Sequence, residues 1–418
     1  MSTNILHALF PMPHFLGDTE MAIANHHHCL HCQHNPLHCI LPPYMLQELA
    51  EQGSPVQQER AQRALSISGQ IREERQQIAD EVPRTTARLA GAAKRRTIYD
   101  AGFKTQLPGR QVRGEGDEPT GDPAVDEAYD GSGETFDLYQ NIYGRNSIDD
   151  QGLPLNSTVH YGQSYDNAFW NGQQMTYGDG DEDLPEEERL FNRFTIAIDI
   201  IAHELTHGVT QYEAGLVYQN QPGALNESFS DVFGSLVKQR KLNQTADQAD
   251  WLIGAGLFTA NVNAQGIRSM KAPGTAYNDP VLGKDRQPAH MRDFYNGSDD
   301  NGGVHINSGI PNRAFYIAAI EIGGYTWEKA GRIWYITLKD KLSRTSNFQE
   351  AAKQTIQVAA DLFGSGSLEQ QAVRKGWAEV GIDIDIDEPK PPTPEPSGCM
   401  LAPAAIFQSL FFPSKRSC

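Results

Sequence analysis

Residues 199–207 have the sequence Asp-Ile-Ile-Ala-His-Glu-Leu-Thr-His, which places a His-Glu-x-x-His motif in an apolar run with helical spacing. Residues four positions apart share one face of an α-helix, so His203 and His207 can direct two imidazole nitrogens at one point. Glu204 follows His203 and can reach a water molecule held at that point. The motif therefore indicates a zinc site, although a helix can also carry two histidines that only pack in a core.

A third ligand candidate follows soon after the motif. A catalytic zinc site needs three protein ligands and an open position for water. Residues 226–231, Asn-Glu-Ser-Phe-Ser-Asp, begin a second run with helical spacing, and Glu227 can supply the missing ligand. Asp231 lies one turn later, where it can accept a hydrogen bond from the outer nitrogen of His203. The sequence thus predicts one catalytic zinc ion held by His203, His207 and Glu227.

The composition restricts the partners of the chain. Its 418 residues predict two or more domains, and 39% hydrophobic with 21% charged residues are typical of a soluble globular protein. A net charge of −18 argues against nucleic acid, whose phosphates need a positively charged surface. No apolar stretch approaches the ~20 residues that cross a bilayer. We therefore expect no nucleic-acid partner and no transmembrane segment. We also expect a monomer.

The ends of the chain bear on its compartment. Residues 1–17 lack a basic region followed by an apolar core, so we expect no conventional signal peptide. A disulfide framework would distribute its cysteines through the fold, but here they lie outside the middle of the chain, at Cys29, Cys32, Cys39, Cys399 and Cys418. We therefore expect a core without disulfides. We also expect a protein that is cytoplasmic as made; the alternative is that it is secreted by a non-classical route.

The first two predicted segments precede the motif helices. Residues 1–35 end in a Cys/His-rich tract that could bind metal but lacks a second ligand cluster, so we interpret them as a disordered extension. Residues 36–95 contain Pro42-Pro43, an amphipathic helix with Met45, Leu46 and Leu49 on one side, and a charged helix over about 55–78. A basic stretch over 87–96 then has the composition of an exposed linker, where proteolytic nicking concentrates.

Three further segments complete the predicted organisation. Residues 96–240 are predicted to be rich in β-structure with long loops as far as about residue 180, and then to contain the motif helices. Residues 241–382 are predicted to be loop-rich at first and then helical, over 306–322, 327–342, 347–362 and 368–380. Residues 383–418 form a proline-rich linker and an apolar tail, which is either an anchor for a membrane surface or partner, or an unstructured end.

Three motifs in this order resemble the thermolysin family of zinc endopeptidases, at residues 203–207, 226–231 and 300–310. The resemblance covers about residues 99–382, and the Pro-Pro-Tyr-Met-Leu stretch at 42–46 resembles the short propeptide of protealysin-like members. It implies an α+β fold with a β-rich N-terminal lobe, an α-helical C-terminal lobe and the zinc-site helix between them. It also implies a neutral metalloendopeptidase made as an autoprocessed precursor, with the propeptide as an intramolecular inhibitor.

The resemblance assigns chemical roles to matching residues. Glu204 would act as the general base on a water molecule and then pass the proton to the leaving amine. Tyr218 and His305 match residues that stabilise the tetrahedral oxyanion, and Asp300 would orient and charge His305. Without the surrounding motif, His305 would be interpreted as a packed core histidine.

The resemblance also assigns substrate contacts. Arg268 matches an arginine that grips a substrate carbonyl and supports Glu227, although it could instead form a surface salt bridge. Asn167 and Ala168 match an edge strand that pairs with the substrate backbone. An apolar pocket implies a preference for a large apolar residue after the scissile bond, and its matching positions are Phe191, Phe194, Ile200 and Ile267.

The chain departs from the family at a site for two calcium ions. The matching positions carry Lys238, Leu252 and Ala255, which offer no carboxylates, while Asp199 and Asp250 remain. Calcium needs several oxygen ligands, and a lysine beside them would repel it. We expect the double-calcium site to be lost, with an ion pair of Lys238 in its place; calcium sites elsewhere remain possible.

Other functions are compatible with parts of the sequence. A zinc aminopeptidase would need a motif such as Gly-x-Met-Glu-Asn, which is absent. The chain could instead be a binding module with an inactive protease core, or an anchored scaffold protein. Neither function would require Glu204, which is intact here. In the precursor, residues 36–90 could cover the cleft with Cys39 as a zinc ligand, since thiolates bind zinc well. The simpler alternative, which we favour, is that Cys39 only packs in the propeptide.

Overall fold

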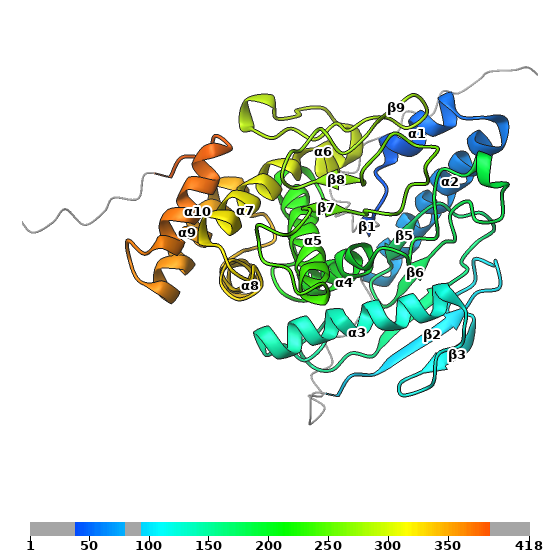
Figure 1. Cartoon of the computed structure of the whole chain (residues 1–418), viewed down its shortest axis with the longest axis horizontal. Helices are drawn as coiled ribbons and strands as arrows, with labels where there is room; N and C mark the ends of the chain where they lie inside the picture. The colour runs from blue at the N-terminus through cyan, green and yellow to red at the C-terminus, as the bar shows by residue number, and fades with distance from the viewer. Residues whose placement is uncertain (1–37, 80–92, 385–418) are drawn as a thin grey trace, which may run out of the picture.

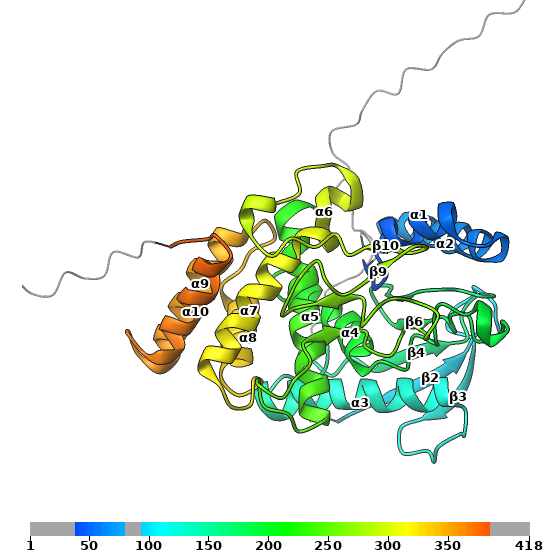
Figure 2. The same ribbon diagram turned by 45° about the horizontal axis from the view of Figure 1, so that its top comes forward.

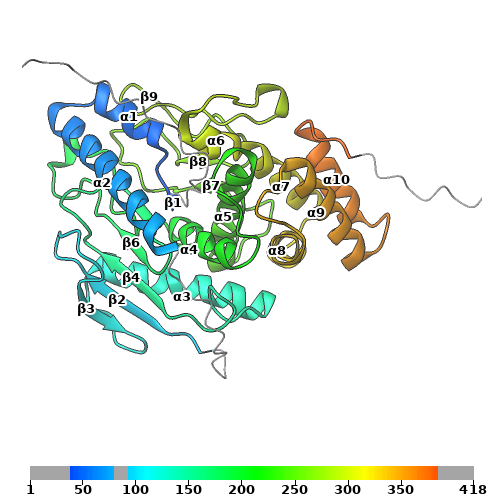
Figure 3. The ribbon, with the colours of Figure 1, turned by 180° about the vertical axis from the view of Figure 1, so that it is seen from behind.

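The computed structural model describes residues 38–79 and 93–384, with side chains from residue 39 to 68 and from residue 93 onward. One lobe contains the main β-sheet and helix α3, and the other contains helices α7 to α10 (Figure 1). Helices α4 and α5 lie between the two lobes in Figures 1 and 3. The expected two-lobed α+β fold, with the motif helices in the middle, is confirmed.

Residues 38–79, which we call the N-terminal segment, form strand β1 (His38–Cys39) and helices α1 (Pro43–Gln52) and α2 (Pro55–Ala79). Pro43 begins α1, where a missing backbone N–H costs nothing. Helix α1 buries the apolar face that the sequence predicts, together with a tyrosine: Tyr44, Met45, Leu46 and Leu49. Figure 2 shows both helices against one side of the molecule, near the hairpin strands β9 and β10.

The main sheet has six strands within the described residues, in the order β1-β5-β6-β4-β2-β3. Its other strands are β2 (Arg96–Asp100), β3 (Arg110–Gly114), β4 (Leu155–Val159), β5 (Ala168–Trp170) and β6 (Met175–Tyr177). Strand β4 is parallel to β2 and β6, while β5 is antiparallel to β6. Strand β1 pairs antiparallel with the other side of β5, so the N-terminal segment covers the edge that β5 would otherwise form.

Helix α3 (Pro123–Tyr143) lies within the region that the sequence predicts to be β-rich, so that prediction is wrong here. The helix has clear ends, because Asp122 accepts hydrogen bonds from the first backbone amides and Gly144 closes it at a φ of 73°. Its interior glycines resemble loop signals. A Cβ atom at Gly131 would lie 2.5 Å from Ile201 Cδ1, so this glycine serves the close packing of α3 on α4.

Helices α4 (Ile198–Tyr212) and α5 (Asn220–Lys241) carry the two motifs and pack against each other. Residues 199–210 of α4 are all buried, as expected for an apolar helix at the centre of a large domain. A Cβ atom at Gly234 of α5 would lie 2.6 Å from the carbonyl oxygen of Asp199. Glycine at this position therefore brings the two helix backbones close together.

The region after α5 begins with short strands and ends in helices. The strands are β7 (Leu252–Ile253), β8 (Arg268–Ser269), β9 (Asn278–Asp279) and β10 (Gly283–Lys284), followed by the short 3-10 helix η2 (Met291–Asp293). Another short 3-10 helix, η1 (Glu186–Glu188), precedes α4. The helices are α6 (Asp299–Asn307), α7 (Gly309–Ile322), α8 (Ala330–Asp340), α9 (Phe348–Phe363) and α10 (Leu368–Glu379). The predicted change from loops to helices is confirmed, with boundaries that differ by a few residues.

Some predictions fall outside the described residues. They concern the Cys/His-rich tract in residues 1–35, most of the basic linker at 87–96, and the proline-rich and apolar tail after residue 384. Among the helices that the structure describes, none is both long and apolar enough to span a bilayer.

His160 connects α3 to the loop after β6, and this contact predicts a pH dependence of stability. Its Nδ1 lies 2.9 Å from Asp179 Oδ2, and its Nε2 lies 3.0 Å from Asp122 Oδ2. The hydrogen bond to Asp179 and the charges of both aspartates raise the pKa of His160 to about 9, although burial opposes the shift. Because the folded pKa of His160 exceeds the unfolded value of ~6.5, the ion pair makes its full contribution to the free energy of unfolding below about pH 6.5. That contribution is lost as the pH rises through the folded pKa.

We expect His160→Gln to lower the free energy of unfolding most below about pH 6.5. The difference from wild type should shrink as the pH rises and be smallest above about pH 9, where the folded-state imidazole is also neutral. Urea unfolding of both proteins at several pH values measures it. A difference that stays constant from pH 6 to pH 10 would contradict the ion pair and leave only packing.

Candidate active site

Helix α4 places His203 and His207 on one face, as their spacing predicts. Both side chains are fully buried, and their rings meet nearly at right angles with centroids 4.7 Å apart. The two Nε2 atoms lie 3.0 Å from each other. Two nitrogens of one helix therefore point at a common position.

Glu227 reaches the same position from helix α5. Its Oε2 lies 3.5 Å from His203 Nε2, and its Oε1 lies 3.4 Å from His207 Nε2. In the described part of the chain, these three side chains form a group whose ligand atoms all lie within 4.8 Å of one another. The structure thus brings together the three residues that the sequence predicts as zinc ligands.

Polar partners hold the outer nitrogen of each histidine. His203 Nδ1 lies 2.8 Å from Asp231 Oδ1, and His207 Nδ1 lies 2.9 Å from Asn226 Oδ1. Both oxygens accept hydrogen bonds, so each histidine carries its proton on Nδ1 and presents the lone pair of Nε2. Ser230 Oγ also lies 3.0 Å from His207 Nδ1.

The arrangement fits a bound zinc ion. Two imidazole lone pairs and a carboxylate facing one point repel each other unless a cation lies between them, and they are ligand types that zinc prefers. Glu227 Oε2 is completely buried and has no hydrogen-bond partner among the described residues. Since buried polar atoms are rarely left without a partner, this oxygen supports a cation at the site.

Asp231 joins the histidine to a buried cation. Arg268 donates from Nε and Nη2 to the two oxygens of Asp231, each at 2.8 Å, and Asn312 Nδ2 donates to Oδ2 at 2.8 Å. Burial alone would raise the pKa of Asp231, but the charge of Arg268 and the hydrogen bond from His203 hold that pKa well below its usual range. Asp231 therefore stays ionised and fixes the orientation of His203.

Arg268 does not contact Glu227 directly in the described hydrogen bonds, although the resemblance implies that it supports this ligand. The arginine contacts Asp231 instead, and the side chain is only 1% exposed. The alternative of a surface salt bridge is therefore wrong. Strand β8 positions Arg268 by pairing antiparallel with β7.

Glu204 lies beside the ligand group and is completely buried. Its Oε2 accepts a hydrogen bond of 3.0 Å from the backbone amide of Trp170 in β5. This contact connects the predicted general base with the strand that is predicted to bind substrate.

Tyr218, His305 and Asp300 form the opposite side of the site. Tyr218 Oη lies 3.0 Å from His305 Nε2 and donates to Glu227 Oε1, while His305 Nδ1 lies 2.6 Å from Asp300 Oδ1. Burial alone would lower the pKa of His305, but the charges of Asp300 and Glu227 raise that pKa to about 9. At neutral pH both nitrogens of His305 are therefore donors.

The turn before His305 has an unusual backbone. Residues 300–303, at the start of α6, have φ values of 54°, 54°, 81° and 77°, which is the left-handed helical region. Gly302 and Gly303 adopt it at little cost, whereas Asp300 and Asn301 are strained. The turn lets Asp300 Oδ2 accept from the backbone amide of His305 at 2.8 Å, so one carboxylate holds both the ring and the backbone.

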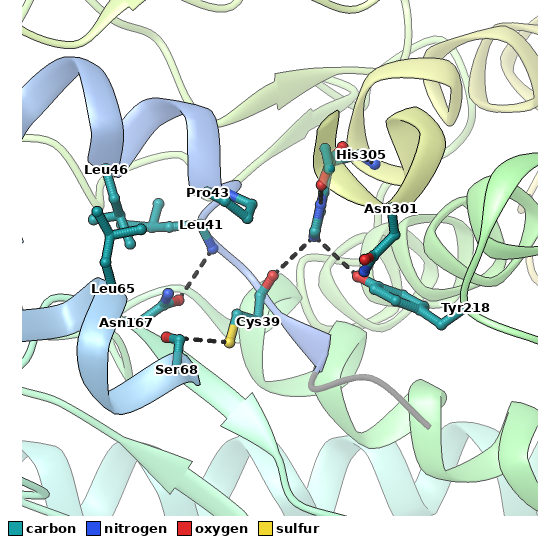
Figure 4. A pocket seen from close by; sticks show the side chains of 11 residues that line it. Cys39, Leu41, Pro43, Leu46, Leu65, Ser68, Asn167, Tyr218, Asn301 and His305 are labelled. Carbon is teal, nitrogen blue, oxygen red and sulfur yellow. Dashed lines mark hydrogen bonds and ion pairs between the residues drawn. The ribbon is translucent and has the colours of Figure 1, made fainter. Parts of the chain in front are cut away.

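The N-terminal segment occupies the site along strand β5 (Figure 4). The amide of Ile40 donates to the carbonyl of Ala168 at 3.2 Å, and the amide of Leu41 donates to Asn167 Oδ1 at 3.1 Å. Arg268 Nη1 donates to the carbonyl of Ile40 at 3.1 Å. The residues predicted to bind a substrate backbone thus bind this chain's own backbone.

Cys39 contributes its backbone carbonyl rather than its thiol to this contact. The carbonyl oxygen lies 3.1 Å from His305 Nε2, whereas Sγ lies 3.8 Å from Ser68 Oγ in α2 (Figure 4). The thiol does not belong to the group of ligand atoms around His203. This geometry favours the packing alternative over zinc ligation by the thiol.

The predicted apolar pocket residues are all buried, at Phe191, Phe194, Ile200 and Ile267. The rings of Phe191 and Phe194 lie 6.0 Å apart, and the side chains of Ile200 and Ile267 meet at Gly254. The structure brings together the members of each pair.

Lys238 forms the ion pair that the departure from the family predicts. Its Nζ lies 3.0 Å from Asp199 Oδ2, 2.9 Å from Asp250 Oδ1 and 2.9 Å from the carbonyl of Leu252. Burial lowers the pKa of Lys238, but the charges of the two aspartates raise it overall. A charged ammonium group therefore joins α4, α5 and the chain at the start of β7.

Several contacts of the site were not predicted. Two of them are the contact of Asn312 with Asp231 and the contact of the Trp170 amide with Glu204. No local sequence pattern predicts either partner. Asn226 is part of the motif at 226–231, and its place one residue before Glu227 could have assigned it to His207.

Comparison with known proteins agrees with this geometry. Residues 73–211 match the family "Thermolysin metallopeptidase, catalytic domain", and residues 214–382 match "Thermolysin metallopeptidase, alpha-helical domain". The chain is 51% identical over 351 residues to an extracellular metalloprotease of Pectobacterium carotovorum subsp. carotovorum, covering 83% of this chain and 97% of that protein. It is 47% identical over 354 residues to protease PrtS of Photorhabdus sp. (strain Az29), covering 84% and 93%.

The fold is similar to a solved precursor. The structure of the precursor of protealysin, a metalloproteinase from Serratia proteamaculans, matches with a TM-score of 0.74 and 53% identity. The match covers 82% of this chain and 99% of that chain, so it includes the N-terminal segment. The chain therefore belongs to the thermolysin family of zinc metalloendopeptidases, as a protealysin-like precursor with a propeptide.

Proposed function

We propose that this metalloendopeptidase cleaves internal peptide bonds before a large apolar residue, and that its precursor removes its own propeptide. The observation that carries the proposal is the backbone of the N-terminal segment along β5. Ile40 pairs with Ala168 and directs its carbonyl at Arg268, and the preceding carbonyl, of Cys39, faces His305. A substrate with its scissile carbonyl at His305 would make the same contacts.

His203, His207 and Glu227 would hold zinc, which supplies a Lewis acid and lowers the pKa of a coordinated water molecule towards ~7. Glu204 would take the proton from the attacking water and give it to the leaving amine. Its buried carboxylate is held by the amide of Trp170, so little reorganisation is needed as the proton moves.

The carbonyl oxygen that gains negative charge would receive hydrogen bonds from His305 and from Tyr218, whose hydroxyl would turn from Glu227 to that oxygen. The oxygen of Cys39 already lies 3.1 Å from His305 Nε2, which is the distance such a donor needs. Asp300 orients His305 and favours its protonated state. Donors of this kind are worth about 3–4 kcal/mol each in the transition state.

The specificity is proposed to come from a pocket formed by Phe191, Phe194, Ile200 and Ile267. Ile40, whose backbone takes the place of the first residue after the scissile bond, is completely buried. A leucine, isoleucine or phenylalanine at this position would gain about 1.5–3 kcal/mol from burial of its side chain.

The propeptide would act as an intramolecular inhibitor, because the N-terminal segment covers the strand edge and the donors that a substrate needs. We propose a division into an extension (1–35), a propeptide (36–95), two catalytic lobes (96–240 and 241–382) and a tail (383–418). Cleavage near the basic stretch before β2 would release the propeptide. The extracellular metalloprotease among its relatives supports a secreted enzyme.

The first test is cleavage of casein by the purified full-length chain, with and without a zinc-specific chelator, while the chain's own length is followed on a gel. We expect chelator-sensitive cleavage that appears as the N-terminal segment is lost. A chain that stays inactive after removal of residues 1–95 and restoration of zinc would contradict the proposal. That outcome would favour a binding module.

We propose that Lys238 takes the place of calcium in the family's double-calcium site. Since the ammonium group already pairs with Asp199 and Asp250 and repels a second cation, added calcium should change the unfolding temperature by less than about 1 °C, apart from effects at other sites. Lys238→Gln should be destabilised and should gain more from calcium than wild type does. Thermal unfolding of both proteins, stripped of metal and then titrated, measures this. Strong stabilisation of the wild type by calcium would contradict the loss of the site.

A further inference from the structure

A second charged site lies beside the predicted substrate strand and plays no part in the proposed chemistry. Among the described residues, Arg60 of α2 contacts two aspartates of the loop after β6. Its Nη1 lies 3.2 Å from Asp181 Oδ1, and its Nη1 and Nη2 donate to the two oxygens of Asp183 at 2.9 and 2.8 Å. The guanidinium of the N-terminal segment is thus held by an acidic site of the catalytic domain.

Asp166 completes this site. It directly precedes Asn167, and its side chain is near enough to Asp181 and Arg60 for their charges to affect its ionisation. Asp166 is 1% exposed, and its Oδ1 has no hydrogen-bond partner in the part of the chain that the structure describes. An unpartnered buried carboxylate oxygen is costly, so it indicates a site built for a cation.

Burial opposes the ionised form of Asp166 and Asp181, and cations of the N-terminal segment favour it. Burial is the main cause that raises the pKa of Asp166 well above its usual value, and the charge of Asp181 adds to it while Arg60 opposes it. Burial also raises the pKa of Asp181, although the amides of Leu190 and Phe191 donate to its Oδ2. Loss of Arg60 would therefore leave a buried acidic site without its cation.

We propose that, after the propeptide leaves, the site formed by Asp166, Asp181 and Asp183 binds the guanidinium or ammonium group of a substrate side chain. The inference rests on the proposed endopeptidase function and adds a substrate class to it. Its ligand is an arginine or lysine at the third or fourth residue after the scissile bond.

The register along β5 gives this position. Cys39 pairs with Phe169, the amide of Ile40 bonds to Ala168, and the amide of Leu41 bonds to the side chain of Asn167. Each successive residue of the bound chain thus lies opposite the preceding residue of the catalytic domain. The residue that precedes Asn167 is Asp166. In the precursor, Pro42 and Pro43 turn the chain away into α1, and α2 brings Arg60 to the site instead. A substrate that stays extended would reach the site directly.

The geometry favours an organic cation over a metal ion. Asp183 holds the guanidinium through two parallel hydrogen bonds, which is the preferred arrangement of an arginine with a carboxylate. The Oδ2 atom of Asp181 is occupied by two backbone amides, so it is not available as a metal ligand. Binding of calcium at this site would instead abolish the preference for arginine when the metal is added.

The test uses enzyme processed from the full-length chain, by itself or by trypsin, which cuts after lysine and arginine and finds such residues between α2 and β2. Fluorogenic peptides share leucine after the scissile bond and carry arginine, lysine or citrulline at the third or fourth following residue. Citrulline keeps the shape of arginine without its charge. We expect kcat/KM to be about tenfold higher for arginine than for citrulline at one of these positions.

Variants then locate the preference. Asp183→Asn changes a residue whose side chain is 56% exposed, so it should fold, and it should reduce the arginine-to-citrulline ratio to about twofold or less. Asp166→Asn should reduce the same ratio, with thermal unfolding as a check on its fold. Glu187→Gln removes an exposed charge four residues after Asp183 in the sequence and should keep the wild-type ratio.

Three results would overturn the inference. The first is an equal kcat/KM for arginine and citrulline peptides at both positions. The second is a preference for arginine that survives Asp183→Asn and Asp166→Asn. The third is a preference that disappears when millimolar calcium is added, because the metal then occupies the site. If no peptide is cleaved, the proposed function fails. Anisotropy with labelled peptides then tests the site by itself, with tighter binding of arginine than citrulline supporting it and equal binding overturning it.

Discussion

Glu204→Gln is expected to reduce casein cleavage by about 10²–10⁴-fold, because an amide cannot accept the proton of the attacking water. The oxygen of glutamine can still accept the hydrogen bond from the amide of Trp170, so the fold and the three ligand side chains should be unaffected. The same variant of the full-length chain should accumulate as the unprocessed precursor. Initial rates on casein and the length of the chain on a gel measure both effects.

Two controls separate loss of chemistry from loss of structure. The zinc content and thermal unfolding of Glu204→Gln should match those of the wild type, and Glu187→Gln, a change of the same type at an exposed position, should stay active. Casein cleavage by Glu204→Gln at the wild-type rate would exclude Glu204 as the general base. Processing of the variant by itself would lead to the same conclusion.

Arg268→Met is expected to lower the free energy of unfolding of the precursor by about 3–5 kcal/mol, because it leaves the buried carboxylate of Asp231 without its cation. Asp231 is completely buried and receives two hydrogen bonds of 2.8 Å from Arg268. The substitution also removes the hydrogen bond to the carbonyl of Ile40, so the propeptide should bind less tightly. Urea unfolding measures the stability.

A double variant tests the cause of this loss. In Arg268→Met with Asp231→Asn, the buried charge is gone while an amide oxygen can still accept from His203, so the double variant should be more stable than Arg268→Met alone. Equal or lower stability of the double variant would show that the packing of the arginine side chain, rather than the uncompensated charge, accounts for the loss.

Local patterns were sufficient for much of the fold. The helical spacing predicted α4, α5 and the C-terminal helices, because burial of one face of a helix repeats every three to four residues. The same patterns misinterpreted α3, where Gly131 and Gly133 have the composition of a loop. Gly131 serves close helix packing, because a larger residue would meet Ile201 of α4, whereas at Gly133 it would meet only the flexible end of Arg96.

The candidate site divides in the same way. His203 and His207 could be paired from their spacing alone, since four residues on a helix place two side chains together. Glu227 followed from the second motif, since a zinc site with two histidines still needs a third ligand. Tyr218, His305 and Arg268 were assigned through resemblance to a family, because no local pattern joins residues on different helices and strands. Neither the residue spacing nor the family resemblance identified Asn312, because its contact with Asp231 joins residues that are 81 positions apart.

The sequence by itself determined the family, the helix with the zinc motif and the charge substitution at Lys238, because each depends on residue types at fixed, short spacings. Only the tertiary structure decided how the N-terminal segment meets the site. Cys39 and His305 are 266 positions apart, and Arg60 and Asp181 are 121 apart. Such contacts arise when packed helices and strands bring distant backbone together, and no short spacing in the sequence records them.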